Sequence, residues 1–441
     1  MKYFILFLFL LVSLVSASFC QVPGNYFDMT LTEIQAPFPS ASIGSLRLWN
    51  TGTDWAHMNP AAGVYEFSQF DQWLDQAATH GVDLLYTFGR TPDWASANPR
   101  LGCSPVPAGE CAPPKDLNPD GSGSDQLWKD FVTAIVTHNK ESRTGHVLHW
   151  EIWNEPNAQG NWQGTVAQIV RMTADAWAII KAIDPTATVN SPAPTGEWKP
   201  DGKHTAVALW MLEFLTLGGG KYLDVLDFHT YVWKHHSIPV AEEVVPLVQS
   251  IQALAAAFHM SSLPLWSTEG SFGSSVDGEE GISDPDQQAA FTARHLLLQR
   301  SERLARFYWF AWNSAPPSEW GTLWTWTQSH GCTISDNSGF LCKAGVAYKQ
   351  ITNWLTGAKF TQPCIPVNGS QLWTCQFSRP GGYQAEAIWD ASRNCSNGYC
   401  RVKSRSVPVQ YRYYRDLAGN RQPIQNHLVP VGAKPIWVEN Q

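Results

Sequence analysis

The feature that most constrains the fold is an alternation of two hydrophobic periods along the first three quarters of the chain, from about residue 25 to 343. Short apolar runs with a period of two, such as residues 82–89, predict strands, and longer segments with a period near 3.6, such as residues 68–81, predict helices. With an early strand near residues 27–32, about eight strands alternate with helices over roughly 300 residues, which is typical of a TIM barrel. The fold class we predict is therefore α/β, a (β/α)8 TIM barrel.

The other predicted elements follow the same alternation, and the sequence lacks the motif expected of the alternative fold, a doubly wound open sheet. A doubly wound open sheet would favour a glycine-rich phosphate loop after a strand, and the sequence has none. The remaining strands are predicted at residues 45–50, 146–154, 186–192, 223–232, 263–270 and 306–312. The remaining helices are predicted at residues 125–140, 165–184, 205–220, 241–260 and 286–304.

The last part of the chain follows a different pattern. From about residue 358 onward, short strand-like runs separated by turns replace the alternation, and they predict a small C-terminal β-sandwich. We predict a signal peptide over residues 1–20, a catalytic barrel over 21–345, and a C-terminal β-sandwich domain over 346–441 that opens with a closing helix.

The N-terminus has the composition of a secretory signal. Lys2 is the only charged residue there, an apolar run follows from Tyr3 to Val15, and small residues close the segment. The run is too short to span a membrane comfortably. We therefore expect a secreted protein, extracellular or periplasmic, with no membrane span after cleavage, which would follow Ala17 or Cys20.

The cysteines support an oxidising compartment. There are nine, and removal of Cys20 with the signal leaves an even set of eight, as expected for disulfides in an exported protein. No Cys-x-x-Cys spacing favours a zinc site. Neighbours in sequence suggest the pairs Cys103–Cys111, Cys332–Cys342, Cys364–Cys375 and Cys395–Cys400.

Net charge and aromatic content limit the classes of molecule that the protein is expected to bind. A formal net charge of -8 argues against a nucleic-acid partner, because no basic patch is available to neutralise phosphates. The 22 tryptophans fit either sugar stacking or a large aromatic core, since indole rings serve both.

Two glutamates lie at the predicted ends of distant strands. The stretch HWEIWNEPN, residues 149–157, places Glu155 at the end of about the fourth strand, where Pro156 stops the ladder. In LPLWSTEG the seventh strand ends at Glu269, which Gly270 follows. The C-terminal ends of barrel strands share one rim, so the two carboxyls should face each other there. A carboxyl pair with one proton donor and one ionised partner is most commonly used in glycoside hydrolysis.

These motifs resemble glycoside hydrolase clan A, and most closely its family 39-type enzymes. The resemblance rests on WNEPN, on Glu269 and on residues 46–96, and it extends over residues 43–313. It implies a (β/α)8 barrel with an appended β-sandwich, Glu155 as acid/base, Glu269 as nucleophile and retention of configuration. It also implies that Asn154 donates a hydrogen bond to a sugar hydroxyl. Gly270 departs from the pattern, because family 39 places an aromatic residue after the nucleophile.

Further residues are candidates for substrate binding. Arg47 is a charge inside an apolar run and needs a buried partner such as a rim carboxylate; the resemblance also places an arginine near the nucleophile. His229 and Tyr231 share one face near a strand end, where a Tyr231 hydroxyl would lower the pKa of Glu269. Trp312, at the last strand end, is a candidate floor for a sugar ring. Each of these side chains could instead fill the barrel mouth.

Glu151 has the same parity as Glu155 and should point into the barrel below the rim. At that depth it is too far from the rim to be the acid, so we interpret it as a structural partner for a cation.

The predicted function is that of a secreted retaining glycoside hydrolase. It would cleave O-glycosidic bonds in a β-linked poly- or oligosaccharide by double displacement, as a monomer, with no cofactor and no metal. Two alternatives remain open: a barrel that binds carbohydrate without cleaving it, and a transglycosylase on the same scaffold.

Overall fold

The computed structural model describes residues 21–196, 206–232, 238–273, 281–314 and 321–441. The predicted signal peptide, residues 1–20, lies outside them. Eight parallel strands form one sheet in the order β5-β4-β3-β2-β1-β8-β7-β6. A parallel bridge between Asn190 and Val225 joins the two ends of this order, so the sheet closes into a barrel. The TIM barrel predicted from the alternation is confirmed.

The barrel strands are short, and each carries mainly buried residues. All eight are parallel to their hydrogen-bonded neighbours, as a barrel requires. Their bounds are β1 Phe27–Met29, β2 Ser45–Leu48, β3 Asp83–Thr87, β4 His149–Glu151, β5 Thr188–Asn190, β6 Leu226–His229, β7 Leu265–Glu269 and β8 Arg306–Trp309.

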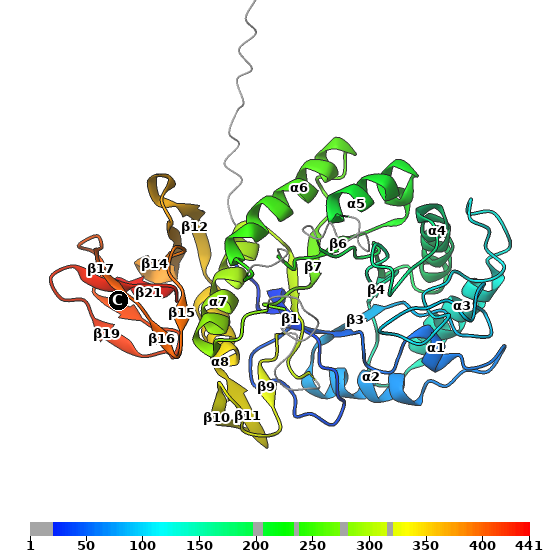
Figure 1. Ribbon diagram of the computed structural model, residues 1–441, viewed down its shortest axis with the longest axis horizontal. Coiled ribbons are helices and arrows are strands. Elements are labelled where there is room, and N and C mark those ends of the chain that lie inside the picture. The colour runs from blue at the N-terminus through cyan, green and yellow to red at the C-terminus, as the bar shows by residue number, and fades with distance from the viewer. Residues whose placement is uncertain (1–20, 197–205, 233–237, 274–280, 315–320) are drawn as a thin grey trace, which may run out of the picture.

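Helices surround the strands (Figure 1). None of the described helices is long and apolar enough to cross a membrane. Their bounds are α1 Trp55–Met58, α2 Ser68–His80, α3 Gln126–Glu141, α4 Val166–Ile183, α5 Val207–Thr216, α6 Val244–Ala257, α7 Pro285–Ser301 and α8 Lys343–Leu355. Short 3-10 turns are η1 Gly24–Tyr26, η2 Gly219–Tyr222, η3 Ala241–Glu243, η4 Val367–Gly369 and η5 Pro380–Gly382.

The alternation is incomplete at one point. The described residues 30–44, between β1 and β2, contain no helix, whereas a full set of eight βα units would place one there. Pro37 and Pro39 lie in the middle of this segment, and proline both lacks the N–H that a helix needs and clashes with the preceding turn. The barrel is therefore complete in its strands, and its first β–β connection carries no helix, in agreement with the predicted elements, which place none there.

Local sequence explains where the helices begin and end. Helix α2 buries Phe70, Trp73 and Ala77 on one face and ends at Gly81, whose φ of 66° is the left-handed conformation of a helix stop. Helix α4 begins with a capping box in which Thr165 and Gln168 satisfy each other's backbone N–H groups.

A small antiparallel sheet separates the last barrel strand from the last helix. It comprises β9 Trp324–Thr325, β10 Cys332–Asp336 and β11 Gly339–Cys342, in the order β10-β11-β9. Helix α8 follows directly and packs against α7.

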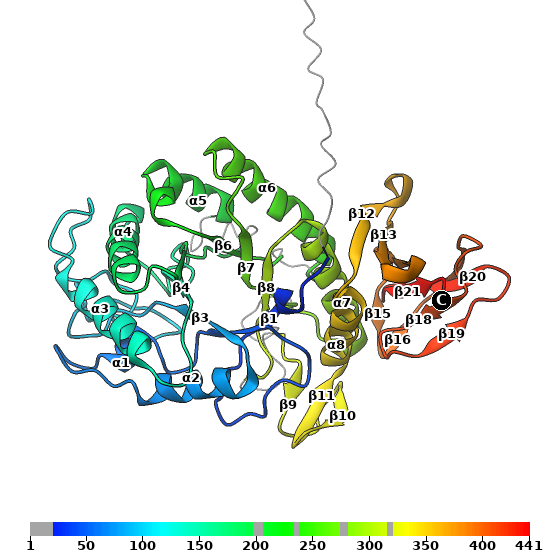
Figure 2. The ribbon, with the colours of Figure 1, turned by 180° about the vertical axis from the view of Figure 1, so that it is seen from behind.

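The C-terminal part forms antiparallel sheets stacked in the manner of a sandwich, as predicted. A six-stranded sheet has the order β12-β13-β14-β21-β18-β19, and β15-β16 and β17-β20 form two further pairs. Figures 1 and 2 show these strands on the outer side of α7 and α8. The strands are β12 Lys359–Pro366, β13 Leu372–Arg379, β14 Tyr383–Asp390, β15 Cys395–Ser396, β16 Tyr399–Cys400, β17 Lys403–Ser406, β18 Tyr413–Arg415, β19 Arg421–Pro423, β20 Leu428–Val431 and β21 Ile436–Glu439.

Helix α7 connects the barrel to the C-terminal sheets. Arg294 Nε donates to the Ala433 carbonyl at 2.8 Å, and the Ser301 hydroxyl accepts from the Cys364 N–H at 2.7 Å. One hydrophobic cluster contains residues of the barrel and of the C-terminal sheet, including Trp354 and Trp437, whose ring centroids lie 5.3 Å apart. The C-terminal sheets are thus part of the same packed body.

All four predicted cysteine pairs are disulfides in the structure. They are Cys103–Cys111, Cys332–Cys342, Cys364–Cys375 and Cys395–Cys400. Disulfides of this number are typical of an oxidising environment outside the cytosol.

Candidate active site

The two predicted glutamates lie at the same rim of the barrel, but they reach it differently. Glu269 is the last residue of β7, as expected. Strand β4 ends earlier than predicted, at Glu151, and Glu155 follows it in the loop. The chain stays beside the sheet through a bridge between Asn154 and Ala193 and through the Glu155 N–H, which donates to the Ala193 carbonyl at 2.9 Å. Glu155 has a φ of 44°, an unusual backbone conformation for a non-glycine residue.

The carboxyls of Glu155 and Glu269 are close neighbours. His229 lies between them: its Nδ1 is 2.9 Å from Glu155 Oε1 and 3.7 Å from Glu269 Oε2. One ligand-type atom from each of the three side chains lies within 4.8 Å of the others. The loop after β4 and the strands β6 and β7 therefore bring together Glu155 and Glu269, which lie more than a hundred positions apart in the sequence.

Glu269 is buried and held by two donors. Arg47 donates to its Oε1, and the Tyr231 hydroxyl donates to its Oε2 at 2.9 Å. Burial raises the pKa of Glu269, while the charges of His229 and Arg47 and the Tyr231 hydrogen bond act in the opposite direction. The predicted bond from Tyr231 is therefore present, but burial outweighs its effect on the pKa.

Glu155 is the more accessible of the two acids. Its side chain is 18% exposed, against 6% for Glu269, so it can exchange a proton with solvent or with a bound ligand more readily. Asn161 Nδ2 donates to Glu155 Oε2 at 3.0 Å. We did not predict Asn161 from the sequence, although its place in the loop just after NEPN was a usable signal.

Arg47 is completely buried and connects the two acids to the barrel interior. It donates to Glu151 Oε1 at 2.5 Å and to Asn154 Oδ1 at 2.7 Å. Burial by itself would lower the pKa of Arg47, but the charges of Glu151 and Glu269 raise it overall. The interpretation of Glu151 as an interior partner for a cation is confirmed, because its carboxylate pairs with Arg47.

A second carboxyl pair lies below Arg47. Asp227, on the same face of β6 as His229, accepts a hydrogen bond from Asn190 at 2.8 Å. Burial and the nearby charge of Glu151 raise the pKa of Asp227 well above its usual range, so it carries a proton. Asp227 Oδ1 and Glu151 Oε2 receive no other hydrogen bond from the described residues, and a proton held by Asp227 between the two carboxyls would satisfy both atoms.

The close packing beneath the rim explains Gly270. A Cβ at this position would lie 2.5 Å from Thr230 Oγ1 and 3.1 Å from Phe307, so no larger residue fits without displacing its neighbours. The aromatic residue that family 39 enzymes carry after the nucleophile has no room here.

Two of the predicted substrate-binding residues lie deeper than the rim surface. Trp312 has no exposed surface and lies nearly parallel to Trp324, with ring centroids 6.5 Å apart. Asn154 is 2% exposed, and its Oδ1 already accepts from Arg47. The substrate contacts expected of Asn154, Arg47, His229, Tyr231 and Trp312 stay predictions.

Glu155, His229 and Glu269 form the one group among the described residues that could share a metal ion. A cation bound by Glu155, His229 and Glu269 would lie next to the buried guanidinium of Arg47, which already pairs with Glu269. Repulsion between two positive charges at this depth disfavours a metal.

Comparison with known proteins agrees with this architecture. Residues 120–336 match the family model of the glycosyl hydrolase catalytic core. No curated protein sequence matches the chain.

Solved structures share the fold at low sequence identity. A monomeric β-xylosidase from Caulobacter crescentus is 16% identical, with a TM-score of 0.64 over 96% of this chain and 97% of that chain. A glucosidase from Croceicoccus marinus is 14% identical, with a TM-score of 0.60 over 96% of both chains. The catalytic domain of a GH30 xylanase C from Talaromyces cellulolyticus is 14% identical, with a TM-score of 0.59 over 96% of this chain and 98% of that chain.

The family match and the shared fold confirm two predictions made from the sequence. Residues 120–336 match a glycosyl hydrolase catalytic core, so the prediction of a glycoside hydrolase holds, and the shared fold agrees with the predicted resemblance to clan A and its family 39-type barrels.

Proposed function

We propose that this enzyme cleaves β-linked glycans with retention of configuration, using Glu269 as nucleophile and Glu155 as acid/base. The observation that carries the proposal is the short separation of the two acids, whose nearest oxygens lie within 4.8 Å. Retaining glycosidases place their carboxyl groups about 5–5.5 Å apart, and inverting enzymes need about 6.5–9.5 Å to admit a water.

The surroundings of each acid support its role. Glu269 contacts the permanent charge of Arg47, which favours the ionised form that a nucleophile requires. Glu155 is more exposed and hydrogen-bonds His229 and Asn161, as suits a group that must give up and regain a proton.

In the first step, a carboxylate oxygen of Glu269 attacks the anomeric carbon while the glycosidic C–O bond breaks. The leaving oxygen takes the proton of Glu155, and a glycosyl–Glu269 ester forms. In the second step, Glu155 removes a proton from water, the resulting hydroxide displaces Glu269, and Glu155 is protonated again. Two inversions at the same carbon give net retention.

The substrate class is a β-linked pentose or hexose glycan, since solved relatives with this fold are described as a β-xylosidase, a glucosidase and a xylanase. We place the mature enzyme outside the cytosol, extracellular or periplasmic. The four disulfides and the signal-like N-terminus support that location.

The test is digestion of a panel of xylans, β-glucans and aryl β-glycosides, with product sizing and NMR of the newly formed anomer. We expect release of the β-anomer first. Glu155→Gln and Glu269→Gln should each reduce kcat at least about a thousandfold.

Azide distinguishes the two roles. It should restore turnover of an activated aryl glycoside by Glu155→Ala with a β-glycosyl azide as product, and by Glu269→Ala with the α-azide. Unchanged hydrolysis in either Gln variant would reject the assignment. Glycosyl transfer to an added sugar as the main product would identify a transglycosylase.

A further inference from the structure

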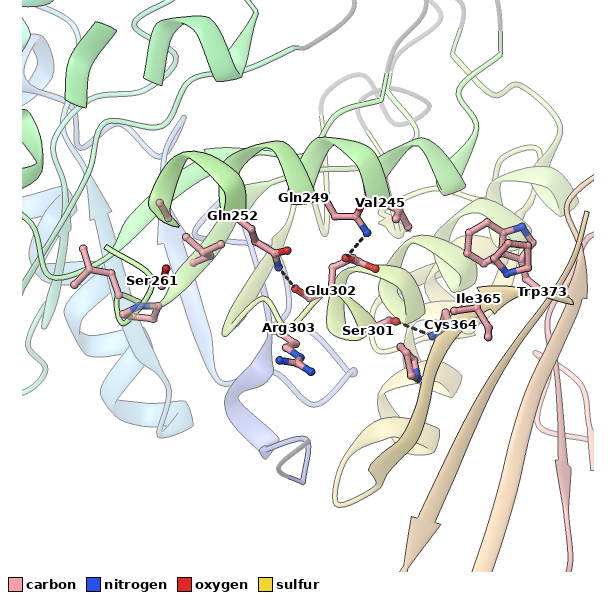
Figure 3. A pocket seen from close by; sticks show the side chains of 16 residues that line it. Val245, Gln249, Gln252, Ser261, Ser301, Glu302, Arg303, Cys364, Ile365 and Trp373 are labelled. Atoms are coloured by element: carbon pink, nitrogen blue, oxygen red, sulfur yellow. Dashed lines mark hydrogen bonds between the residues drawn. The ribbon is translucent and has the colours of Figure 1, made fainter. Parts of the chain in front are cut away.

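A second concave site lies between the barrel and the C-terminal sheet. The groove has a volume of about 680 Å³, and its lining comes from α6, from the chain around the end of α7, and from β12 and β13. Figure 3 shows it running below α6, from Ser261 at one end to Trp373 at the other. Its volume is in the range of sites that bind small molecules or short polymer segments.

One end of the groove is aromatic and apolar. Trp373, from β13, lies nearly parallel to Trp389 with ring centroids 5.9 Å apart, so the indole is held in a fixed orientation. Ile365 of β12 is beside it in the lining and is 43% exposed, so an accessible aliphatic surface adjoins the indole.

The long wall of the groove is polar. Gln249 and Gln252 point from one face of α6 toward Glu302 (Figure 3). Gln249 Nε2 donates to Glu302 Oε2 at 3.2 Å, and Gln252 Nε2 donates to the Glu302 carbonyl at 2.6 Å. These bonds fix both amides, and neither amide oxygen accepts a hydrogen bond from any described residue. Both oxygens are therefore positioned acceptors for a ligand hydroxyl.

The charge of the groove selects a neutral ligand. Glu302 and Arg303 are the charged residues that line it, and their formal charges cancel. A phosphate or a polyanion would find no cluster of cations, and a lipid chain would meet a row of amides. A ligand with a flat apolar face and a rim of hydroxyls matches both the indole and the amide oxygens.

We propose that this groove is a second glycan-binding site, which holds a neutral β-linked chain with one sugar against Trp373 and further hydroxyls on Gln249 and Gln252. The face of α6 that lines it, from Val245 to Ala255, is about 15 Å long, enough for a short run of sugars. The site would keep the enzyme attached to its polymer.

The groove is separate from the catalytic rim. Leu265, which lines the groove, begins β7, and Glu269 ends it. Ser301 and Glu302 likewise precede β8. The groove thus lies at the N-terminal ends of the barrel strands, and the acid pair lies at their C-terminal ends. A glycan in the groove does not compete sterically with one at Glu155 and Glu269.

The experiment measures polymer binding with catalysis removed. The full chain carrying Glu155→Gln and Glu269→Gln is run in affinity gels containing soluble β-xylan or soluble β-glucan, with and without Trp373→Ala. We expect retardation by at least one polymer, and about tenfold weaker binding after Trp373→Ala. Gln249→Ala, on the exposed side of α6, should weaken binding as well and tests the site if Trp373→Ala misfolds.

The matched control is Tyr399→Ala, which removes an aromatic side chain that is 66% exposed on the same domain. It should leave retardation unchanged. In the active enzyme, Trp373→Ala should raise KM for the polymer while kcat/KM on an aryl glycoside stays constant. The proposal is overturned if neither polymer retards the parent, or if both groove variants bind as the parent does. Failure of the acid-pair assignment would appear separately, as digestion of the polymer by the double variant, whereas failure of the groove proposal appears as unchanged retardation of the groove variants.

Discussion

At the residue scale, the site depends on one buried cation shared by several acceptors. Arg47 contacts Glu151, Asn154 and Glu269 and has no exposed surface. A guanidinium presents its donors in a rigid planar fork, so it fixes the relative positions of strands β2, β4 and β7 as well as balancing their charge. Its partners then differ in position: Glu151 is fully buried in the barrel interior, and Glu269 lies at the rim beside Glu155 and His229.

Tyr231→Phe tests whether the Tyr231 hydroxyl lowers the pKa of Glu269, the proposed nucleophile. The Tyr231 hydroxyl donates to Glu269 and lowers its pKa against the effect of burial. Without the hydroxyl the pKa of Glu269 rises further, and a higher fraction of the enzyme is protonated at acid pH. We expect the acid limb of the kcat/KM profile to move to higher pH, with about ten- to a hundredfold lower activity at the optimum. Tyr399→Phe, on an exposed surface, should leave the profile in place; an acid limb that does not move in Tyr231→Phe would contradict the role of this hydrogen bond.

Asp227→Asn tests the proton shared with Glu151. A folded-state pKa raised above the unfolded value of about 4 stabilises the fold below that pH, and the contribution is lost as pH rises toward the folded pKa. An amide keeps the bond from Asn190 and can donate to Glu151 without this dependence. We expect the Tm of Asp227→Asn relative to the parent to increase from pH 4 to pH 8, with activity near that of the parent.

The control for that prediction is Asp227→Ala, which removes the hydrogen bonds themselves. It should lower Tm at every pH, because the Glu151 and Asn190 polar groups lose their partner. A Tm of Asp227→Asn that falls relative to the parent as pH rises would show that Asp227 is ionised in the folded protein.

At the element scale, α7 differs most from a surface helix. Nearly every residue from Pro285 to Ser301 is buried, because the helix is covered on two sides: His295 packs against Phe307 and Trp309 of the barrel, and Arg294 contacts the C-terminal part of the chain. The burial of His295, with no opposing charge beside it, lowers the pKa of its imidazole to about 3, so it is neutral in the folded protein. Helix α7 is therefore an internal element, and Arg294 holds the interface between it and the C-terminal sheets.

Arg294→Ala tests how much the interface between α7 and the C-terminal sheets contributes to stability. Arg294 donates to the Ala433 carbonyl and pairs with Glu242, and it is 3% exposed. Its removal leaves a buried carboxylate without its cation, which should cost about 3 kcal/mol in the free energy of unfolding. Urea unfolding followed by tryptophan fluorescence measures the loss. Arg143→Ala, at an exposed position, should change the free energy of unfolding by less than about 0.5 kcal/mol. Equal effects of the two substitutions would show that Arg294 does not stabilise the interface between α7 and the C-terminal sheets.

At the scale of the whole molecule, barrel and C-terminal sheets share one hydrophobic cluster. Phe360, Phe377, Trp389 and Trp437 belong to the same cluster as the barrel residues, whereas the second cluster, around Val429 and Val438, is small. Two units with a continuous core support each other's folding, so neither is expected to be independent.

A chain that stops after Ala358 tests this dependence. It would uncover the outer face of α7 and remove Ala433, whose carbonyl accepts from Arg294, and Lys434, which pairs with Asp286. We expect loss of soluble expression, or a protein whose melting is broad and whose glycosidase activity is lost. Soluble yield, the thermal melt followed by circular dichroism and aryl glycoside hydrolysis are the measurements. A soluble, fully active truncated chain would show that the barrel folds alone.

The sequence by itself determined the barrel, the C-terminal β-sandwich, the disulfide pairs and the two glutamates at the barrel rim, because each depends on local signals. Period, cysteine spacing and proline position are properties of short windows. The same signals placed the end of β4 too late, since the residues from Ile152 to Glu155 continue along the sheet without forming its ladder.

Only the tertiary structure decided which side chains meet. The 4.8 Å grouping of Glu155, His229 and Glu269, the burial of Trp312, and the pairing of Glu151 with Asp227 depend on the closure and depth of the barrel. The groove at Trp373 exists because two parts of the chain pack across α7. No sequence window contains both sides of such a contact, so distance, burial and electrostatics appear only once the chain has closed on itself.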